Sequence, residues 1–364
     1  MARRMLLHLV VLGASVLMIA VFRLNRAGHP EPEGWPELKA WIRANGGQVS
    51  KKLALEDTHH GGFTVRGLVT TARIQESEVV ILLPDSLTIR SEHYPEIHGV
   101  DLGETCGKLS DVRRLDVKHA LAFALEFSKG DESFYAPYIR LLPSLEDFKS
   151  YLPQFAPAAV LLGLRAIPVW EAVRKVQEDF DNMQACWEAW KQEPTYPERL
   201  LPIPWEAVLL GLLQFQTRAF THGENSSRLV PLADMMNTGT KSENNVEMDD
   251  EREEFVLTSV GDIERGEEVL DPYVGAMSPN RILVPVYGTY VESGLYGVRP
   301  LELEECPEPA RQFVWDTLAG VGPGGEEVPL CDRKILNMSQ GPAHCSLARF
   351  TYEYCGKAWG WRSF

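Results

Sequence analysis

Two polar side chains, Asp234 and Asn237, lie three residues apart in an apolar run that begins at Leu229, in the segment RLVPLADMMNTGT. Such a run is expected to be buried, and a buried carboxylate or amide is costly unless it is paired. Both side chains therefore need partners within the fold. The partners could be backbone groups of an Asx-type turn, or a bound ligand that completes the hydrogen bonds.

Three other side chains, Arg218, Tyr273 and Tyr287, are of types that can act on a small polar ligand. A guanidinium can bind a planar carboxylate through two parallel hydrogen bonds. A phenol can hydrogen-bond a nitrogen and orient its lone pair, while its ring attracts a neighbouring cation. Each also has an ordinary structural interpretation, because arginine stems often extend over helix surfaces and strand-end tyrosines are often packing residues.

The elements that must position these residues alternate between strand and helix patterns. Residues 61–89 combine β-branched residues with turn formers and predict short strands, with Pro84 ending the apolar strand 79–83. Strand patterns resume at Leu229 and over 254–273. Between them, apolar residues recur at spacings of three and four and predict helices over 112–130, 155–190 and 204–220. This order indicates a block of helices, about a hundred residues long, inserted within a β fold.

The composition is that of a folded globular protein with an acidic balance. The 364 residues are 45% hydrophobic and 24% charged, and 51 acidic against 36 basic residues give a net charge of −15. This charge opposes binding to nucleic acid and favours basic partners. An acidic stretch over 242–255 carries much of the charge and is expected to be a solvated loop or hairpin tip.

Six cysteines are scattered along the chain without a C-x-x-C pair, which argues against a zinc site or a dense disulfide framework. We expect reduced thiols that pack as small apolar residues. A single bridge among Cys331, Cys345 and Cys355 stays open if the compartment is oxidising. No metal site is expected.

The N-terminus carries an apolar stretch, Met5–Phe22, with arginines on both sides. At about 1.5 Å of rise per residue its length just reaches across a membrane. It could be a single-pass signal anchor, a cleaved secretory or bipartite leader, or an organelle presequence, since no acidic residue precedes Glu31. Residues 1–26 are therefore expected to anchor the protein in a membrane or direct it to an organelle. A linker and a first helix are expected over 27–50.

Six segments of the chain occur in a characteristic order. They are VRGLVTTARIQESEVVILLPDSLTI, ALAFALEFSKGDESFYAPYIRLLPS, QTRAF, LVPLADMMNT, GEEVLDPYVGAMSPN and VYGTYVESG, and they cover about residues 65–294. In this order they resemble the SET-domain protein methyltransferases, in the branch typified by the Rubisco large-subunit lysine methyltransferase and the actin histidine methyltransferase. One segment alone would be weak, but six in order are specific.

The resemblance implies an α+β SET-domain fold with a large helical insert over about 111–225. The family transfers a methyl group from S-adenosylmethionine (SAM) to a nitrogen on a protein side chain, and cofactor and target enter a narrow channel from opposite faces. The implied catalytic residues are Tyr287 and Tyr273. The implied cofactor-binding residues are Arg66, Gly67, Leu68, Arg218, Asp234, Asn237, Thr238 and Tyr273. Among these, Asn237 would hold the methionine end of SAM, Asp234 would fix its loop, and Arg218 would support the cofactor's carboxylate.

Several positions depart from the family pattern. Val65 stands at the first glycine of the family's Gly-x-Gly-Leu, so a Cβ occupies a place where the backbone normally approaches SAM. Thr238 replaces the histidine of an Asn-His pair, and Leu82 replaces a frequent acidic residue. The SET domain is predicted over 51–297. Residues 298–364 are too few for the family's helical substrate-binding lobe, so a short, partial C-terminal region is expected.

The sequence therefore predicts a SAM-dependent protein N-methyltransferase that acts on lysine of a non-histone protein. Histidine is the alternative target within this class. A rival is a catalytically weak SET fold kept as a binding module for basic peptides, and a third is a membrane-tethered scaffold without a ligand. The expected partner is a protein with a basic target side chain, with no nucleic acid. Any membrane attachment would run through residues 5–22, and a monomer is expected.

Overall fold

The structure is a computed structural model, and it describes residues 32–60, 63–155, 168–222, 226–239, 242–249, 254–273 and 282–289. The predicted anchor or leader at 1–26 and the predicted partial region at 298–364 lie outside the described residues. Within the described ranges, no helix combines the length and the apolar character that crossing a membrane requires. The predicted domain boundaries stay predictions.

A four-stranded antiparallel sheet forms the main β part of the molecule, in the order β1-β4-β8-β7. Its strands are β1 (Gln48–Val49), β4 (Val79–Leu83), β7 (Val246–Asp249) and β8 (Phe255–Ser259). The central pair joins β4 to β8, with Leu82 opposite Val256. Branched and aromatic residues suit this pleated, buried surface, and Ile81, Leu83 and Phe255 are fully buried there. The predicted strand over 79–83 is confirmed.

Two antiparallel hairpins complete the β structure. The first pairs β2 (Leu53–His60) with β3 (Phe63–Thr70), and the second pairs β5 (Phe220–His222) with β6 (Ser226–Arg228). Isolated bridges join more distant segments. Val69 of β3 pairs with Glu268, and Asn237 pairs in parallel with Leu270. These bridges draw the first hairpin, the Asn237 loop and the segment before Tyr273 together.

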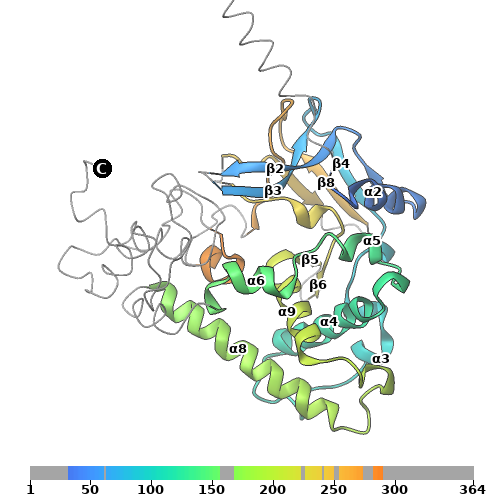
Figure 1. The fold of residues 1–364 in the computed structure, drawn as a ribbon, viewed down its shortest axis with the longest axis vertical. Helices are drawn as coiled ribbons and strands as arrows, with labels where there is room; N and C mark the ends of the chain where they lie inside the picture. Colours follow the sequence, from blue (N-terminus) through green and yellow to red (C-terminus); the bar gives the residue numbers. More distant parts are fainter. Residues whose placement is uncertain are drawn as a thin grey trace, which may run out of the picture.

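The helices gather mainly on the side away from the sheet, where Figure 1 shows α3, α4, α8 and α9, while α2 lies beside the sheet. They are α2 (Trp35–Ala44), α3 (Pro95–His98), α4 (Asp111–Ser128), α5 (Ala136–Ile139), α6 (Leu145–Tyr151), α8 (Pro168–Lys191) and α9 (Trp205–Arg218). Short turns are η1 (Asp85–Leu87), η2 (Ser91–His93), η3 (Gly130–Glu132), η4 (Pro153–Phe155), η5 (Glu198–Leu200), η6 (Ala233–Met235) and the π-helix η7 (Leu283–Tyr287). The predicted helices over 112–130 and 204–220 are confirmed as α4 and α9. Of the third, the part from 168 onwards is confirmed as α8.

Helix α9 fixes the position of Arg218, which lies in its last turn. It packs closely on α4, because a Cβ at Gly211 would come 2.5 Å from the carbonyl oxygen of Ala120. Val208 and Leu213 of α9 are fully buried in the core. Only glycine, which lacks a Cβ, permits this close contact between the two helix backbones. The contact holds the C-terminal end of α9 in a defined position.

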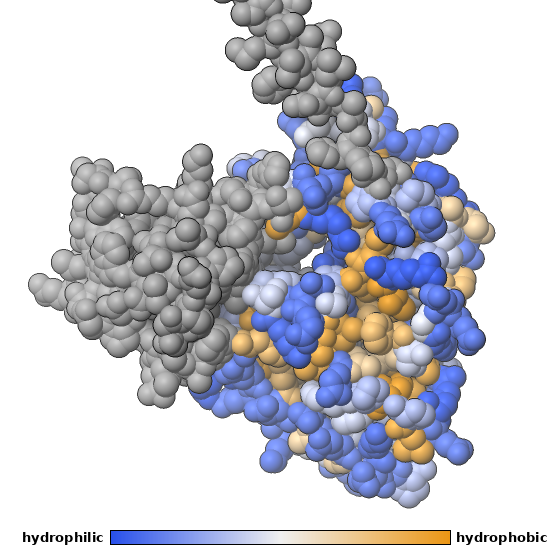
Figure 2. All heavy atoms as spheres, viewed as in Figure 1, coloured by the Kyte–Doolittle hydropathy of each residue, from blue (hydrophilic) through white to orange (hydrophobic). Residues whose placement is uncertain are grey.

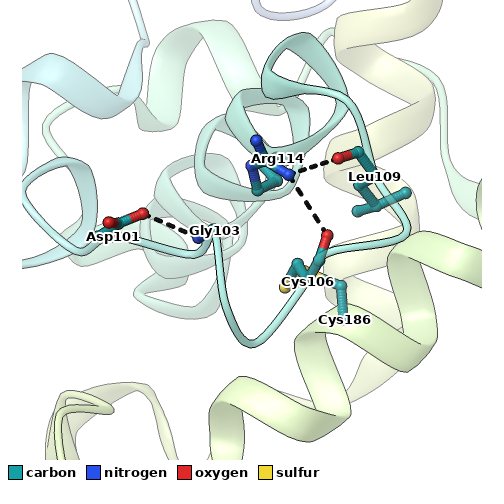
Figure 3. The surroundings of a disulfide bond; sticks show 6 residues. All are labelled: Asp101, Gly103, Cys106, Leu109, Arg114 and Cys186. Carbon is teal, nitrogen blue, oxygen red and sulfur yellow. Dashed lines mark hydrogen bonds between the residues drawn. A yellow bond between two sulfur atoms is a disulfide. The ribbon is translucent and has the colours of Figure 1, made fainter.

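A disulfide joins Cys106, in the loop before α4, to Cys186 on α8, 80 residues further along the chain (Figure 3). The same loop is held by Arg114, whose Nη1 donates to the carbonyl oxygen of Leu109. Our expectation of reduced thiols is wrong for these two cysteines, because a pairing across 80 residues has no local signature in the sequence. The other four cysteines lie outside the described residues.

The segment that begins at Leu229 is not the strand that its apolar run predicts. Leu229 makes an isolated bridge with Ile89, and the chain then turns into η6. Leu232, fully buried, has a φ of 74°, a conformation that costs a non-glycine residue roughly 1–3 kcal/mol. The run is apolar because residues 229–239 form a buried loop rather than a paired strand. This strained loop carries Asp234 and Asn237.

Candidate active site

A first cavity, of about 520 Å³, lies among β3, α6, α9 and the η6 loop. Six residues singled out in the sequence line it, namely Arg66, Arg218, Asp234, Asn237, Tyr273 and Tyr287. Figure 2 shows hydrophilic and hydrophobic residues mixed on the described surface of this side, and a hollow between the β part and the helices. The fold thus brings side chains from five segments of the chain to one cavity.

A second cavity, of about 280 Å³, shares a wall with the first. The residues that line both are Thr217, Arg218, Asp234, Met236, Tyr273 and Tyr287. Beyond this shared wall, the second cavity is lined by Phe220, Met248 and two acidic residues, Glu247 and Asp271. The two cavities therefore meet at one arginine, one aspartate and two phenols.

Asp234 is the most enclosed charged side chain of the shared wall. Its Oδ2 accepts a hydrogen bond from the hydroxyl of Tyr138 at 2.7 Å, and Nη1 of Arg218 lies 3.7 Å away. The same Nη1 donates to the main-chain oxygen of Asp234 at 2.8 Å. Burial raises the pKa of Asp234, while Arg218 and the Tyr138 hydroxyl favour the ionised form. Asp234 therefore ties the η6 loop to both α9 and α5.

Two buried polar atoms of this pair have no hydrogen-bond partner among the described residues. They are Oδ1 of Asp234, an acceptor, and Nε of Arg218, a donor. Buried polar atoms in native proteins are normally paired, and an exception at a cavity indicates a missing ligand or water. Asp234 and Arg218 thus provide one hydrogen-bond acceptor and one hydrogen-bond donor beside the first cavity.

Asn237 is held in one orientation by its surroundings. Its Nδ2 donates to a carboxylate oxygen of Glu268 at 2.7 Å and to the main-chain oxygen of Arg66 at 3.2 Å. Two acceptors on one side require the NH₂ group there, so the amide oxygen points the other way. The main-chain oxygen of Asn237 accepts from the backbone N–H of Asp271 at 2.9 Å. Backbone and side chain are thus both fixed.

Gly67 explains how Glu268 and Asn237 fit against β3. A Cβ on Gly67 would overlap the Glu268 carboxylate and lie 2.8 Å from Nδ2 of Asn237. The missing side chain leaves the room in which these two groups meet. Gly67 therefore acts on the site through Asn237 rather than as part of the cavity lining.

The guanidinium groups of Arg66 and Arg218 come together at the first cavity. Burial lowers the pKa of Arg66, and the positive charge of Arg218 lowers it further. Arg66 also donates through Nη2 to the main-chain oxygen of Leu141. An anionic group bound here would relieve the repulsion between the two cations.

The two phenols of the shared wall stack against each other. The ring centroids of Tyr273 and Tyr287 lie 4.8 Å apart at an angle of 35°. The Tyr287 hydroxyl donates to the main-chain oxygen of Tyr273 at 3.3 Å, and the Tyr273 hydroxyl donates to that of Met236 at 2.6 Å. Burial raises the pKa of Tyr287 to about 12 and that of Tyr273 further. Both phenols are therefore protonated at neutral pH, and each oxygen can still accept a hydrogen bond.

No protein-family model matches the sequence, and no curated protein matches it. Solved structures do match. The SET domain of LSMT bound to lysine and AdoHcy aligns with a TM-score of 0.54 and 19% identity over 79% of this chain. Rubisco LSMT bound to AdoMet aligns with a TM-score of 0.55 and 21% identity over the same share. The chain has a SET-domain fold. It spans 64% and 63% of those two structures' chains, so it covers less than two thirds of their length.

A further LSMT SET-domain structure, bound to MeLysine and AdoHcy, aligns over 90% of this chain and 89% of its own, with a TM-score of 0.57 and 15% identity. The predicted fold class, an α+β SET domain with helices between its strands, is confirmed by these likenesses. At 15–21% identity they establish the fold and not the activity.

Three residues predicted to bind the cofactor do not line either cavity of this SET fold. Leu68 is fully buried in the core, Gly67 makes room for Glu268, and Thr238 is 2% exposed with its hydroxyl 3.5 Å from the backbone nitrogen of Tyr273. Val65 lines the first cavity without filling it. The valine therefore narrows the site but leaves space for a ligand.

Several residues of the site were not found from the sequence. Arg140, Asp147 and Tyr151 line the first cavity from α6 and the segment before it, and Tyr138 holds Asp234 from α5. The segment ALAFALEFSKGDESFYAPYIRLLPS contains two of them, but its pattern indicates only a helix. Their role depends on how the helical insert packs against β3, which no local spacing records.

Proposed function

We propose that the protein is a SAM-dependent protein N-methyltransferase whose target is a lysine side chain. The observation that carries the proposal is the meeting of two cavities at Arg218, Asp234, Tyr273 and Tyr287. A transfer between two molecules needs two binding spaces that touch at the reacting atoms. A wall of phenols between the two spaces suits a reaction in which a cationic sulfur faces a nitrogen.

The residues of the first cavity fit the amino-acid end of SAM, which carries a carboxylate and an ammonium group. Arg66 and Arg218 offer donors to the carboxylate, and Asp234 offers an unpaired oxygen to the ammonium. The volume of about 520 Å³ falls in the range of roughly 300–1,000 Å³ that small-molecule sites occupy. Charge, unpaired atoms and size therefore all agree with this ligand.

The similar structures support the same assignment by analogy. They hold AdoMet, AdoHcy or sinefungin. Three of the four also hold lysine or a methylated lysine. A shared fold is a weaker argument than a shared site, because one fold can serve several functions. The analogy gains weight here because Arg218, Asn237 and the two tyrosines converge on the cavities of this chain.

In this mechanism SAM supplies a methyl group on a positively charged sulfur. Arg66 and Arg218 would bind its carboxylate end, and Asn237, held by Glu268, lines the same cavity. Tyr273 and Tyr287 orient the target nitrogen through their oxygens and surround it with aromatic rings. Neither phenol removes a proton, since burial raises the pKa of both above the usual value. Alignment of the reactants is then the main source of rate.

Lysine is preferred over histidine as the target because of the second cavity. Its lining adds Glu247 and Asp271 to the shared wall, with aromatic and methionine side chains around them. Acidic groups attract a lysine ammonium more strongly than a largely neutral imidazole. Histidine remains the alternative target.

The Cys106–Cys186 disulfide supports an oxidising compartment, since such bonds persist in secreted and lumenal proteins and are rare in the cytosol. We infer that the apolar segment 5–22 directs or anchors the protein there. Mass spectrometry of the protein isolated from its cells after thiol blocking is expected to find this peptide pair linked. Recovery of both thiols in the blocked, reduced form would contradict the inference.

Methyl transfer itself is tested by incubating the full-length chain with labelled SAM and a proteome extract. We expect label in protein, and methyllysine in the acid hydrolysate. Tyr287→Phe, which keeps the ring and loses the hydroxyl, is expected to lower labelling with little change in SAM binding. Label in methylhistidine would favour the alternative target, and no label above a heat-treated control would contradict the proposed function.

A further inference from the structure

Among the residues that the structure describes, three carboxylates line the second cavity, and they differ in what they bind. Asp234 accepts a hydrogen bond from Tyr138 and faces Arg218, and Glu247 of β7 is exposed. Asp271 is partly buried and lines the cavity, and no residue that the structure describes gives its carboxylate a hydrogen bond or an ion pair. Asp271 is therefore the carboxylate that can receive a ligand there.

The backbone of Asp271 is fixed where the two cavities meet. Its N–H donates to the main-chain oxygen of Asn237 at 2.9 Å, and Leu270 beside it pairs with Asn237 in the parallel bridge. Tyr273 follows two residues later and stacks on Tyr287. Asp271 thus lies on the same rigid segment as one phenol of the shared wall.

The groups around Asp271 leave its charge uncompensated. The charged and titratable side chains that face this cavity are Arg218 from α9, Asp234 from η6, Glu247 from β7, Tyr287 from η7 and Tyr273 from its own segment. Arg218 is the single cation among the described residues of this lining, and Asp234 already faces it. Burial raises the pKa of Asp271 to about 7. Near neutral pH this carboxylate can therefore both accept and release a proton.

We propose that Asp271 receives the ammonium group of the target lysine and takes one proton from it, a role that rests on the proposed methyltransferase function. An N–H bond breaks, an O–H bond forms on Asp271, and the electron pair stays on the nitrogen. The neutral amine would then be able to attack the methyl carbon of SAM, and the electron pair of the carbon–sulfur bond would stay on sulfur. Asp271 returns its proton to water before the next turnover.

The test uses the full-length chain, L-lysine as the probe, and saturating AdoHcy in the calorimeter cell. L-norleucine, which has the same carbon chain without the side-chain amine, measures what the rest of the molecule contributes to binding. We expect the wild-type chain to bind lysine at least about tenfold more tightly than norleucine. Asp271→Asn, which keeps the size and removes the charge, should lose this preference while its affinity for AdoHcy stays within about twofold.

Glu247→Gln is the matched control, since it removes the exposed carboxylate of the same cavity. Because water screens an exposed carboxylate, Glu247→Gln should weaken the preference for lysine much less than Asp271→Asn does. A second readout is the pH dependence of lysine binding. In the wild-type chain, affinity should rise as the pH passes about 7 and Asp271 ionises, and Asp271→Asn should remove this rise.

Three results would overturn the role of Asp271. They are an Asp271→Asn variant that still prefers lysine, a Glu247→Gln variant that loses the preference instead, and a wild-type chain that binds AdoHcy but not lysine. Binding of AdoHcy is measured first, with thermal unfolding as the check that each variant is folded. A folded wild-type chain that does not bind AdoHcy would overturn the proposed function itself, and it is distinguished at that step.

Discussion

The two cavities differ in the charges that they place beyond their shared wall. The first adds two arginines, Arg66 and Arg140, and two aspartates, Asp57 and Asp147. The second adds two carboxylates and no cation among its described lining residues. A cavity lined by both positive and negative side chains suits a ligand that carries both charges, such as an amino-acid end group. A cavity whose added charges are all negative suits a cation.

This difference shows how one wall can keep two ligands apart. Both proposed ligands carry positive charge at the reacting centre, a sulfonium on one side and an amine on the other. Under the proposed function, carboxylates on the second side would stabilise the incoming cation and provide a place for its proton. The arginines on the first side would bind the remote end of the other ligand, away from the reacting atoms.

The largest expected effect comes from removing the Arg218 side chain, which lines both cavities. Arg218→Ala leaves the buried Asp234 carboxylate without its cation, and losing one partner of a buried pair costs roughly 3–5 kcal/mol of unfolding free energy. The thermal shift produced by SAM should disappear as well. Chemical unfolding with and without SAM measures both.

The double variant Arg218→Met with Asp234→Asn separates these two effects. It removes the unpaired charge, so most of the stability should return, whereas SAM binding should not. A variant at Arg218 that still shows the full SAM shift would mean that the first cavity does not hold the cofactor.

Removing the disulfide should affect stability without affecting the site, because the bond lies in the helical part and neither cysteine lines the two cavities. The double variant Cys106→Ser with Cys186→Ser should lower the unfolding free energy by about 2–4 kcal/mol. SAM affinity should stay unchanged, since the wall is intact. Urea unfolding and calorimetry measure the two quantities, and a large loss of affinity would link the helical part to the site.

The acidic cavity predicts a stability that falls as pH rises. The pKa of Asp271 is about 7 in the folded chain and about 3.9 when unfolded, so the folded state binds more protons between these values. Ionising the buried Asp271 carboxyl lowers the unfolding free energy. This cost is absent below about pH 4, grows between pH 4 and 7, and is complete above pH 7. Asp271→Asn should therefore be more stable than wild type by up to about 4 kcal/mol at pH 8, and equally stable at pH 4. Urea unfolding at both pH values tests this, and an equal difference at both would contradict it.

The smallest expected effect concerns Gly67, which acts on the first cavity from outside it. In Gly67→Ala, the new Cβ would press on Glu268 and Asn237 and should cost about 1–3 kcal/mol of unfolding free energy. SAM affinity should fall as Asn237 shifts. Gly261→Ala is the matched control, since a Cβ there meets nothing within 4 Å. Equal effects at both glycines would contradict the positioning of Asn237 by Glu268.

The sequence predicted the parts of the site that local segments specify. Asn237, Arg218 and the two tyrosines lie in short runs whose order along the chain resembles a known family, and all four reach the cavities. The strand over 79–83 and the helices α4 and α9 were predictable because their apolar spacing matches one element each.

The remainder depends on contacts between distant segments. Tyr138 reaches Asp234 across 96 residues, and Glu268 reaches Asn237 only because β3 has no side chain at Gly67. The Cys106–Cys186 pair and the strained loop at Leu232 likewise follow from packing. No periodicity in the sequence carries this information, so the contact between Glu268 and Asn237 and the position of Asp271 in the second cavity became visible only in the structure.

The most direct test of the account is a calorimetric titration of the full-length chain with SAM and with decarboxylated SAM, which lacks the α-carboxylate. The account predicts binding of one SAM per chain, and an affinity for the decarboxylated form lower by at least about tenfold, because Arg66 and Arg218 lose their anion. No heat with SAM, or equal affinity for the two compounds, would contradict it.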